Sequence, residues 1–209
     1  MILNSEADAR AFCSAMTDSA GMARLDRLAR MVVDENGRQN LMSKPSEAAI
    51  WLRHLADSAQ LLALVPRGTS SWLDLGTGAG FPGLVIAAMK PEATVALVES
   101  RKKRVDWLVR AAIELELPNC RVEGRRLEQV DSFPAAVISA RAFAPLSKLL
   151  ALSARFSTRD TCWLLPKGRS AVQEVASLPD TVAAMFHVER SLTDAEAGIV
   201  IGTGRPDST

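Results

Sequence analysis

The segment that most constrains the fold is SSWLDLGTGAGFPGLVIAAM, residues 70–89. Its apolar run ends in three alternating glycines, Gly76, Gly78 and Gly80, and an alanine-rich helix is expected to begin after Pro82. A strand, a glycine turn and a helix N-terminus, in that order, present free backbone N–H groups to an anionic or nucleotide-like ligand. The segment therefore predicts an α/β domain with a ligand at the carboxyl end of this strand.

Short β-type runs alternate with helical patterns from residue 70 onward. We expect strands at 71–75, 93–100, 120–124, 135–140, 161–166, 184–190 and 198–204, and helices at 82–89, 102–117, 125–130 and 145–156. This alternation indicates right-handed βαβ units and a mostly parallel sheet that is covered on both faces. The last two strands are joined by a short connection, which predicts a terminal antiparallel hairpin.

The first third of the chain has helical periodicity and no good strand. We therefore predict a helical extension at 1–68, packed on an α/β domain at 69–209. Apolar residues recur at helix spacing up to Val32, Gly37 is expected to end that helix, and Ser43 is expected to start the next.

Charge and cysteine content limit the partners of the protein. The net charge is +1 with a pI near 7.7, so any basic surface that binds nucleic acid must be local. The three cysteines are widely spaced and form no metal-ligand motif. With no basic and apolar leader and no long apolar stretch, we expect a cytoplasmic monomer that uses neither a metal nor a membrane.

Two cofactor classes compete for the glycine turn. Residues 78–83 match the GxGxxG fingerprint of dinucleotide-binding proteins, but Pro82 removes an N–H donor where a pyrophosphate would dock. The wider frame, an acid at Asp74 followed by alternating glycines, resembles the first motif of S-adenosylmethionine-dependent methyltransferases. A carboxylate beside the turn also suits a cationic ligand better than a pyrophosphate. This favours S-adenosylmethionine as the cofactor.

A second acid stands at the end of the next expected strand. Glu99 lies 19 residues after Gly80, where a carboxylate can accept hydrogen bonds from both ribose hydroxyls. Nicotinamide enzymes and methyltransferases share this feature, so Glu99 supports a nucleoside ligand without choosing one. The alternative is that Asp74 and Glu99 are ordinary caps at strand ends.

The remaining motifs bear on the methyl acceptor. Enzymes that methylate exocyclic amines of bases carry an Asn/Asp-Pro-Pro-aromatic loop after the fourth strand, where this chain has Ser139-Ala140-Arg141-Ala142-Phe143. Methylation of a pyrimidine carbon needs a cysteine nucleophile, and no cysteine is well placed. A purine ring nitrogen is already nucleophilic and needs no strong base, which fits the chain.

A run of four basic residues, 101–104, directly follows Glu99. A run of this kind at a helix start is either a solvated helix surface or a set of contacts to RNA phosphates. Both alternatives remain open at this point.

Six segments of the sequence together resemble one family. They are NLMS (40–43), RHLADS (53–58), DLGTGAGFPG (74–83), ESRKKR (99–104), ARAFAPL (140–146) and PKG (166–168). In this order they resemble the bacterial small-subunit ribosomal RNA guanine-N7 methyltransferases, also called glucose-inhibited division protein B. The resemblance implies a Rossmann-like class I S-adenosylmethionine-dependent methyltransferase fold with a seven-stranded sheet and a helical N-terminal cap. It also implies methylation of N7 of a loop guanine, guanine 527, in the 16S ribosomal RNA of the small subunit.

The same resemblance implies the site residues. Those expected at the cofactor are Asp74, Gly76, Thr77, Gly78, Gly80, Phe81, Glu99, Leu127, Glu128 and Arg141. Those expected at the RNA are Asn40, Arg53, His54, Lys102, Lys103, Arg104 and Lys167. Arg141 is the candidate catalytic residue, and it orients either the cofactor carboxylate or the target nucleotide. Lys167 is expected to contact a phosphate or the target loop.

Two questions stay open in this comparison. Arg53 and Asp57 are four residues apart on an expected helix, so they either pair with each other or face the RNA. The chain also lacks an acid in SFPAAV (132–137) and a basic residue in DAEAGIV (194–200), where family members often have them. The other functions that fit are a small-molecule methyltransferase, a nicotinamide oxidoreductase and an RNA-binding or ribosome-assembly factor without activity.

Overall fold

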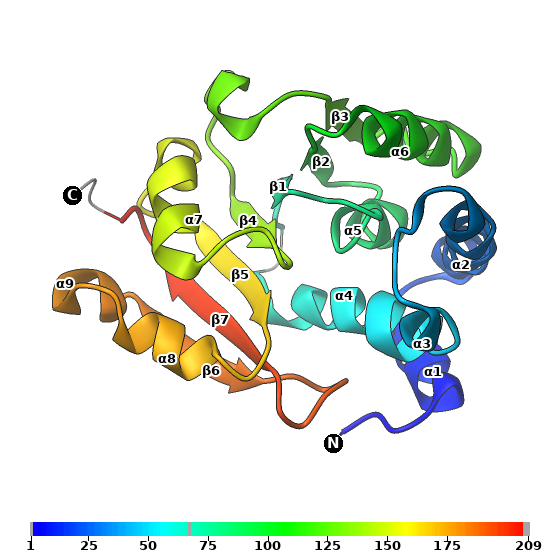
Figure 1. Ribbon diagram of the computed structural model, residues 1–209, viewed down its shortest axis with the longest axis horizontal. Helices are drawn as coiled ribbons and strands as arrows, with labels where there is room; N and C mark the ends of the chain where they lie inside the picture. The colour runs from blue at the N-terminus through cyan, green and yellow to red at the C-terminus, as the bar shows by residue number, and fades with distance from the viewer. Residues whose placement is uncertain (1, 67, 207–209) are drawn as a thin grey trace.

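The predicted seven-stranded sheet is confirmed in the computed structural model, which describes residues 2–66 and 68–206 (Figure 1). Its strands are β1 (Ser71–Leu75), β2 (Thr94–Val98), β3 (Cys120–Glu123), β4 (Val137–Ala140), β5 (Cys162–Lys167), β6 (Phe186–Arg190) and β7 (Gly198–Thr203). They lie in the order β3-β2-β1-β4-β5-β7-β6. The first five strands are parallel, and β7 runs antiparallel to both β5 and β6. The terminal hairpin is therefore also as predicted.

The strand order places a switch point at the middle of the sheet. The chain moves outward from β1 to β2 and β3, then returns to add β4 on the other side of β1. At such a point the connections after the two central strands diverge and leave a crevice beyond their carboxyl ends. The glycine turn follows β1 and Arg141 follows β4, so both lie at this crevice.

Helices cover both faces of the sheet (Figure 1). The longer helical elements are α1 (Glu6–Met16), α2 (Ser19–Gln39), α5 (Gly83–Met89), α6 (Lys102–Glu114), α7 (Leu146–Ser153) and α8 (Ala171–Ala176). The shorter ones are α3 (Lys44–Glu47), the π-helix η1 (Trp51–Ala56), α4 (Asp57–Ala59), α9 (Asp180–Ala183) and the 3₁₀ turns η2 (Gln60–Leu64), η3 (Leu127–Gln129) and η4 (Ala154–Phe156). None of the helices in the described part of the chain is long and apolar enough to cross a membrane.

Alternation along the strands builds two cores, one on each face of the sheet. On β1, Trp72 packs toward α5, α6 and the N-terminal helices, whereas Leu73 and Leu75 pack toward α7, α8 and α9. This period of two follows from the geometry of a strand, whose successive side chains point to opposite faces. The N-terminal helices thus share one core with the sheet.

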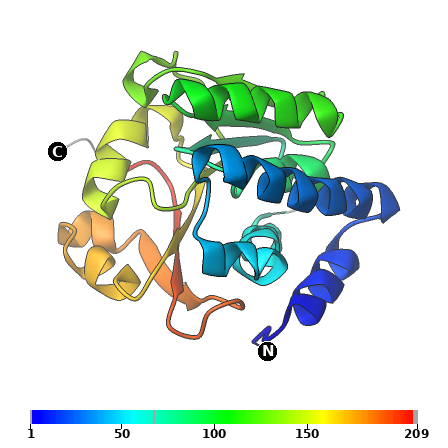
Figure 2. The same ribbon diagram turned by 45° about the vertical axis from the view of Figure 1, so that its right-hand side comes forward.

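The structure corrects one expected helix end. Gly37 lies inside α2 and does not end it. The helix ends at Asn40, whose left-handed backbone (φ 48°) forms the C-cap and bonds back to the Asn36 carbonyl. Figure 2 shows α2 running beside α6, and the two helices are joined by an ion pair between Glu35 and Arg110 (2.8 Å). The helix predicted at 125–130 is only the single 3₁₀ turn η3.

The position of Gly37 predicts a stabilising substitution. A Cβ added there meets no atom within 4 Å, and the residue is exposed on the helix. Gly37→Ala should therefore raise the free energy of unfolding by about 0.5–1 kcal/mol, because alanine loses less backbone entropy in a helix. Denaturant unfolding measures this change. Gly21→Ala in the same helix is the control: it should not raise the free energy of unfolding, since its Cβ would lie only 2.0 Å from Thr17 Oγ1. An unchanged or lower stability for Gly37→Ala would contradict the expectation.

Candidate functional site

The turn after β1 needs glycine for its backbone and for its close contacts. Gly76 and Gly78 both have left-handed φ values, 62° and 60°. A Cβ on Gly76 would come within 2.4 Å of the Phe143 ring, and one on Gly78 would lie 3.4 Å from Arg104 Nη1. The turn is thus flanked by the segment after β4 on one side and by the basic run of α6 on the other.

The buried Asp74 side chain stabilises this turn through hydrogen bonds. Its side chain is fully buried, with Oδ1 accepting from the Ser139 hydroxyl (2.7 Å) and Oδ2 from the Gly83 N–H (3.1 Å). Ser139 accepts in turn from the Trp72 indole N–H at 2.8 Å. Burial raises the pKa of Asp74 to about 6, against the opposing effect of these hydrogen bonds. Asp74 was expected at the cofactor, but the structure places it behind the turn, where it joins β1, β4 and α5.

A first cavity of about 390 Å³ opens beyond β1 and β2. It brings together four of the residues expected at the cofactor, namely Gly76, Glu99, Leu127 and Glu128. The Glu99 carboxylate accepts from the backbone N–H groups of Ser100 and Arg101 and from the Arg101 guanidinium. Burial raises the pKa of Glu99, but hydrogen bonds and the charge of Arg101 outweigh it and lower the pKa below its usual value. Glu99 is therefore an ionised acceptor at the cavity wall.

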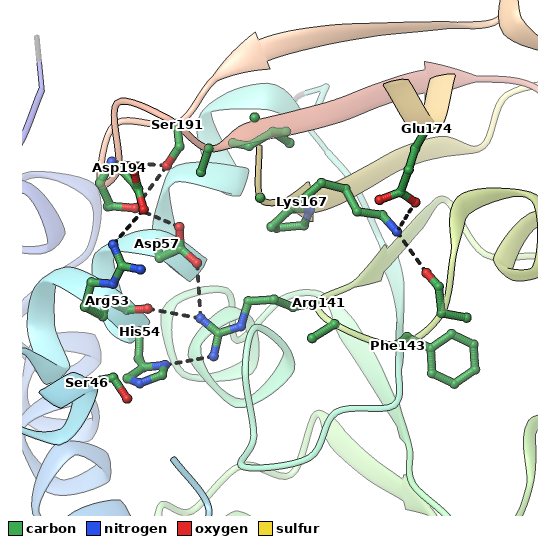
Figure 3. Close-up of a pocket in the computed structure, with 18 of the residues that line it drawn as sticks. Ser46, Arg53, His54, Asp57, Arg141, Phe143, Lys167, Glu174, Ser191 and Asp194 are labelled. Atoms are coloured by element: carbon green, nitrogen blue, oxygen red, sulfur yellow. Dashed lines mark hydrogen bonds and ion pairs between the residues drawn. The ribbon is translucent and has the colours of Figure 1, made fainter. Parts of the chain in front are cut away.

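A second cavity of about 900 Å³ (Figure 3) adjoins the first, and both are lined by Ala142, Phe143 and Ala144. It brings together four further expected residues from distant parts of the chain, namely Arg53, His54, Arg141 and Lys167. Thr77, Gly78, Gly80 and Phe81 line neither of these two cavities. The Phe81 ring instead stacks on the His54 imidazole, with 4.9 Å between centroids.

Arg141 connects the sheet to the helical extension. Its Nη1 donates to the Arg53 carbonyl and to Asp57 Oδ2, both at 3.1 Å, and its Nη2 lies 2.8 Å from His54 Nδ1. The guanidinium also lies over the Phe81 ring, 5.3 Å from its centroid. Figure 3 shows the three directed contacts of the head group at the edge of the second cavity. Together with the face of the Phe81 ring, they fix its position.

His54 is a neutral side chain of defined tautomer. Burial, together with the nearby charges of Arg141 and Arg53, lowers its pKa to about 3. A guanidinium only donates, so Nδ1 is the acceptor and the proton is on Nε2. The buried Nε2 has no hydrogen-bond partner among the described residues.

Arg53 and Asp57 do not form the ion pair that was one of the two alternatives for them. Arg53 donates instead to Asp194 at 2.8 Å, across 141 positions of sequence. Asp57 accepts from Arg141 on Oδ2 and from the Thr193 hydroxyl on Oδ1 (2.7 Å). Asp194 and Thr193 lie between β6 and β7, so this loop pairs with the helical extension.

Lys167 lines the second cavity but is already paired. Its ammonium donates to Glu174 (2.8 Å) and to the Ala144 carbonyl (2.9 Å), and only 10% of its side chain is exposed. Glu174 itself is held by the Leu146 N–H and the Ser170 hydroxyl. The sequence analysis did not identify Glu174. The one indication available was that the ammonium of Lys167, largely buried at a strand end, requires an acidic partner.

The other expected RNA residues lie outside both cavities. Lys102 is highly exposed and is paired with Asp106 (3.5 Å), whereas Arg104 donates to the Asn40 carbonyl (3.2 Å). Lys103 is exposed, and its carbonyl accepts from Gln39. These residues form a basic surface at the start of α6 and the end of α2, and Arg104 lies next to the glycine turn. Asn40 is the C-cap of α2, and its carbonyl accepts from Arg104.

Comparisons with known proteins bear on this arrangement. The family model described as rRNA small subunit methyltransferase G matches residues 22–198. Two similar relatives carry the name ribosomal RNA small subunit methyltransferase G. The one from Erythrobacter litoralis is 56% identical over 204 residues, covering 98% of this chain and 99% of the relative. The one from Novosphingobium aromaticivorans is 53% identical over 206 residues, covering 97% and 90%.

Solved structures support the fold. A mutant of MtNAS in complex with S-adenosylmethionine is 15% identical with a TM-score of 0.58, covering 96% of this chain and 78% of that chain. Fibrillarin in a complex with Nop5p is 15% identical with a TM-score of 0.57, covering 73% and 82%. At these identities the likeness concerns the fold alone, and it confirms the predicted Rossmann-like methyltransferase architecture.

Ionisation of Asp74 should appear in the pH dependence of stability. Its folded-state pKa is above that of the unfolded chain, so the unfolded state loses its proton first as the pH rises from about 4 to 6. The wild type should therefore lose on the order of 2–3 kcal/mol of unfolding free energy over this range relative to Asp74→Asn. Denaturant unfolding of both proteins at matched pH measures the difference. If the stabilities of the two proteins change in parallel with pH, the pKa of Asp74 is not raised in the folded state, and the expectation is wrong.

The state of His54 can be read directly by NMR. The chain has two histidines, so the signals missing from a His54→Asn variant identify this residue. We expect its imidazole nitrogens to report the Nε2–H tautomer and to stay unchanged between pH 5 and 8, because its pKa is about 3. In Arg141→Ala the pKa should rise, since a nearby positive charge is removed. A titration of wild-type His54 within this range would contradict the assignment.

Proposed function

Since the chain belongs to the rRNA small subunit methyltransferase G family, we propose that it transfers a methyl group from S-adenosylmethionine to N7 of a guanine in 16S ribosomal RNA. By resemblance the target is guanine 527. The observation that supports this most is the meeting of two cavities at residues 142–144, beside Arg141. The first cavity has the volume and the hydrogen-bond acceptors for a nucleoside, and the second has room for the guanine base.

The first cavity fits the cofactor. Its volume of about 390 Å³ lies within the range of small-molecule sites. Glu99 Oε2 accepts only from the exposed Arg101 guanidinium among the described residues, so ribose hydroxyls can replace that contact. Leu127 offers an apolar wall to the adenine, and the Gly76 backbone can approach the methionine end. The bound cofactor would supply an electrophilic methyl group on its sulfonium.

The second cavity fits an acceptor that needs no deprotonation. The Asp57 and Glu174 carboxylates are engaged by hydrogen bonds, and His54 Nδ1 is occupied by Arg141. No residue among these is placed as a free general base, which suits a purine N7 whose lone pair attacks directly. The contribution of the protein is then orientation and exclusion of water, and Arg141 at the junction is the proposed orienting residue.

RNA is the proposed source of that purine. Lys102 and Lys103 are exposed at the start of α6 and offer contacts to phosphates. The near-zero net charge of the chain means that this local cluster must supply much of the electrostatic attraction. The resulting surface is continuous in sequence with Glu99 at the cofactor cavity.

The test uses purified protein, labelled S-adenosylmethionine and small ribosomal subunits that lack this methylation. We expect label in 16S RNA as 7-methylguanosine at one site. Arg141→Ala should lower kcat/KM about 100-fold, because the reactants lose their alignment. Lys102→Glu with Lys103→Glu should weaken RNA binding and reduce its salt dependence, with the slope changing by about 1 to 2.

The matched control is Arg159→Glu, which alters an exposed cation before β5, at the amino end of the parallel strands. It should leave both methylation and RNA binding unchanged. Cofactor binding without label in ribosomal RNA would favour a small-molecule acceptor. RNA binding by the wild type without turnover would instead favour a binding or assembly factor.

A further inference from the structure

The start of the chain contacts two elements that line the second cavity, the loop between β6 and β7 and the π-helix η1. The Leu3 N–H donates to the Leu192 carbonyl (2.8 Å) in the loop between β6 and β7. Glu6, at the start of α1, accepts from the backbone N–H groups of Trp51 (3.0 Å) and Leu52 (2.7 Å). Leu3 and Glu6 precede the part of the chain that matches the family model, residues 22–198.

The contact of Glu6 compensates for an unusual helix. Residues Trp51–Ala56 form a π-helix, and no side chain caps it from Ile50. The first N–H groups of a helix have no partner within it, and they attract negative charge. A carboxylate that accepts from two successive N–H groups therefore fixes both the start and the direction of this helix. Glu6 reaches it across 45 positions of sequence.

The π-helix in turn holds Arg141. The Arg53 carbonyl and His54 Nδ1 both belong to it, and both contact the Arg141 guanidinium, at 3.1 and 2.8 Å. The Arg53 side chain extends to Asp194 on the opposite wall. A rotation or shift of the π-helix would move these acceptors away from the guanidinium together.

We propose that Glu6 is a positioning residue for the acceptor cavity. It holds the π-helix so that Arg53 and His54 keep Arg141 aligned at the junction of the two cavities. The kinetic consequence of this role rests on the methyl transfer proposed above, whereas the structural consequence at His54 does not.

A matched control lies on the same helix. Asp8 is the other acid in the first turn of α1, but it is exposed and its carboxylate accepts from the Asn4 N–H (3.3 Å). The Ser5 cap accepts from the backbone N–H of residue 8, which an alanine retains. Asp8→Ala removes the same charge without touching the π-helix. A change that follows only from charge or from the stability of α1 should therefore appear in both variants.

The test compares Glu6→Ala, Glu6→Gln and Asp8→Ala in the full chain. In Glu6→Ala we expect the His54 nitrogen signals to shift and to become pH-dependent at higher pH than in the wild type, because Arg141 is released. kcat/KM for small subunits should fall about tenfold, while the Kd for S-adenosylmethionine changes less than twofold. Glu6→Gln should recover part of both effects, since its amide oxygen still accepts. Asp8→Ala should match the wild type.

A double-mutant cycle distinguishes positioning from general stability. If Glu6 acts through Arg141, Glu6→Ala should lower kcat/KM little further in an Arg141→Ala background. Full additivity, or a Glu6→Ala protein with unchanged His54 signals, would overturn the proposal. If Glu6→Ala fails to fold, Glu6→Gln decides: smaller shifts of the His54 nitrogen signals support the proposal, and unchanged signals overturn it. If the wild type methylates no RNA, the proposed function fails, and the His54 signals alone decide the role of Glu6.

Discussion

A buried carboxylate at the end of β1 is the contact on which the site depends. Asp74 binds the Gly83 N–H at the start of α5 and the Ser139 hydroxyl on β4, and it is fully shielded from water. In such surroundings a hydrogen bond is strong and an unpaired polar group is costly, so the geometry is sharply defined. The glycine turn above Asp74 and Arg141 beyond Ser139 are thereby held at a constant separation.

Pairing of charges is the second theme of the site. Arg53, Arg141 and Lys167 in the larger cavity each have a carboxylate partner, and the only histidine there is held neutral. A cavity of this kind orients a ligand through fixed donors and acceptors, and it has little capacity to take up or release protons. This matches a reaction in which the acceptor is already a nucleophile and alignment is the main requirement.

The helical extension is part of the site. Its π-helix supplies one wall of the larger cavity, and the loop between β6 and β7 supplies the facing wall. Its long helix α2 docks on α6 through Glu35 and Arg110, and Arg104 of α6 bonds to the Asn40 carbonyl at the end of α2. The extension therefore connects the basic surface, the second cavity and the sheet.

The sequence by itself determined the features that depend on local order. The glycine turn, Glu99 at the end of the next strand and the alternation of strands and helices all follow from spacing within a few tens of residues. They predicted the fold and two residues of the first cavity, Gly76 and Glu99, whereas Leu127 and Glu128 were predicted only from the resemblance to the family. Gly37 shows the limit of sequence-based prediction even at short range, because the helix continues past it to the left-handed C-cap at Asn40.

Asp74 and Arg53 show the limit of such prediction at long range. A motif identifies an acid beside a turn, but only packing decides whether it faces the ligand or the core. Spacing of four residues makes Arg53 and Asp57 possible partners, but tertiary structure brought Asp194 and Arg141 closer, across 141 and 84 positions. Ion pairs are chosen by distance in space, and a single sequence does not contain that distance.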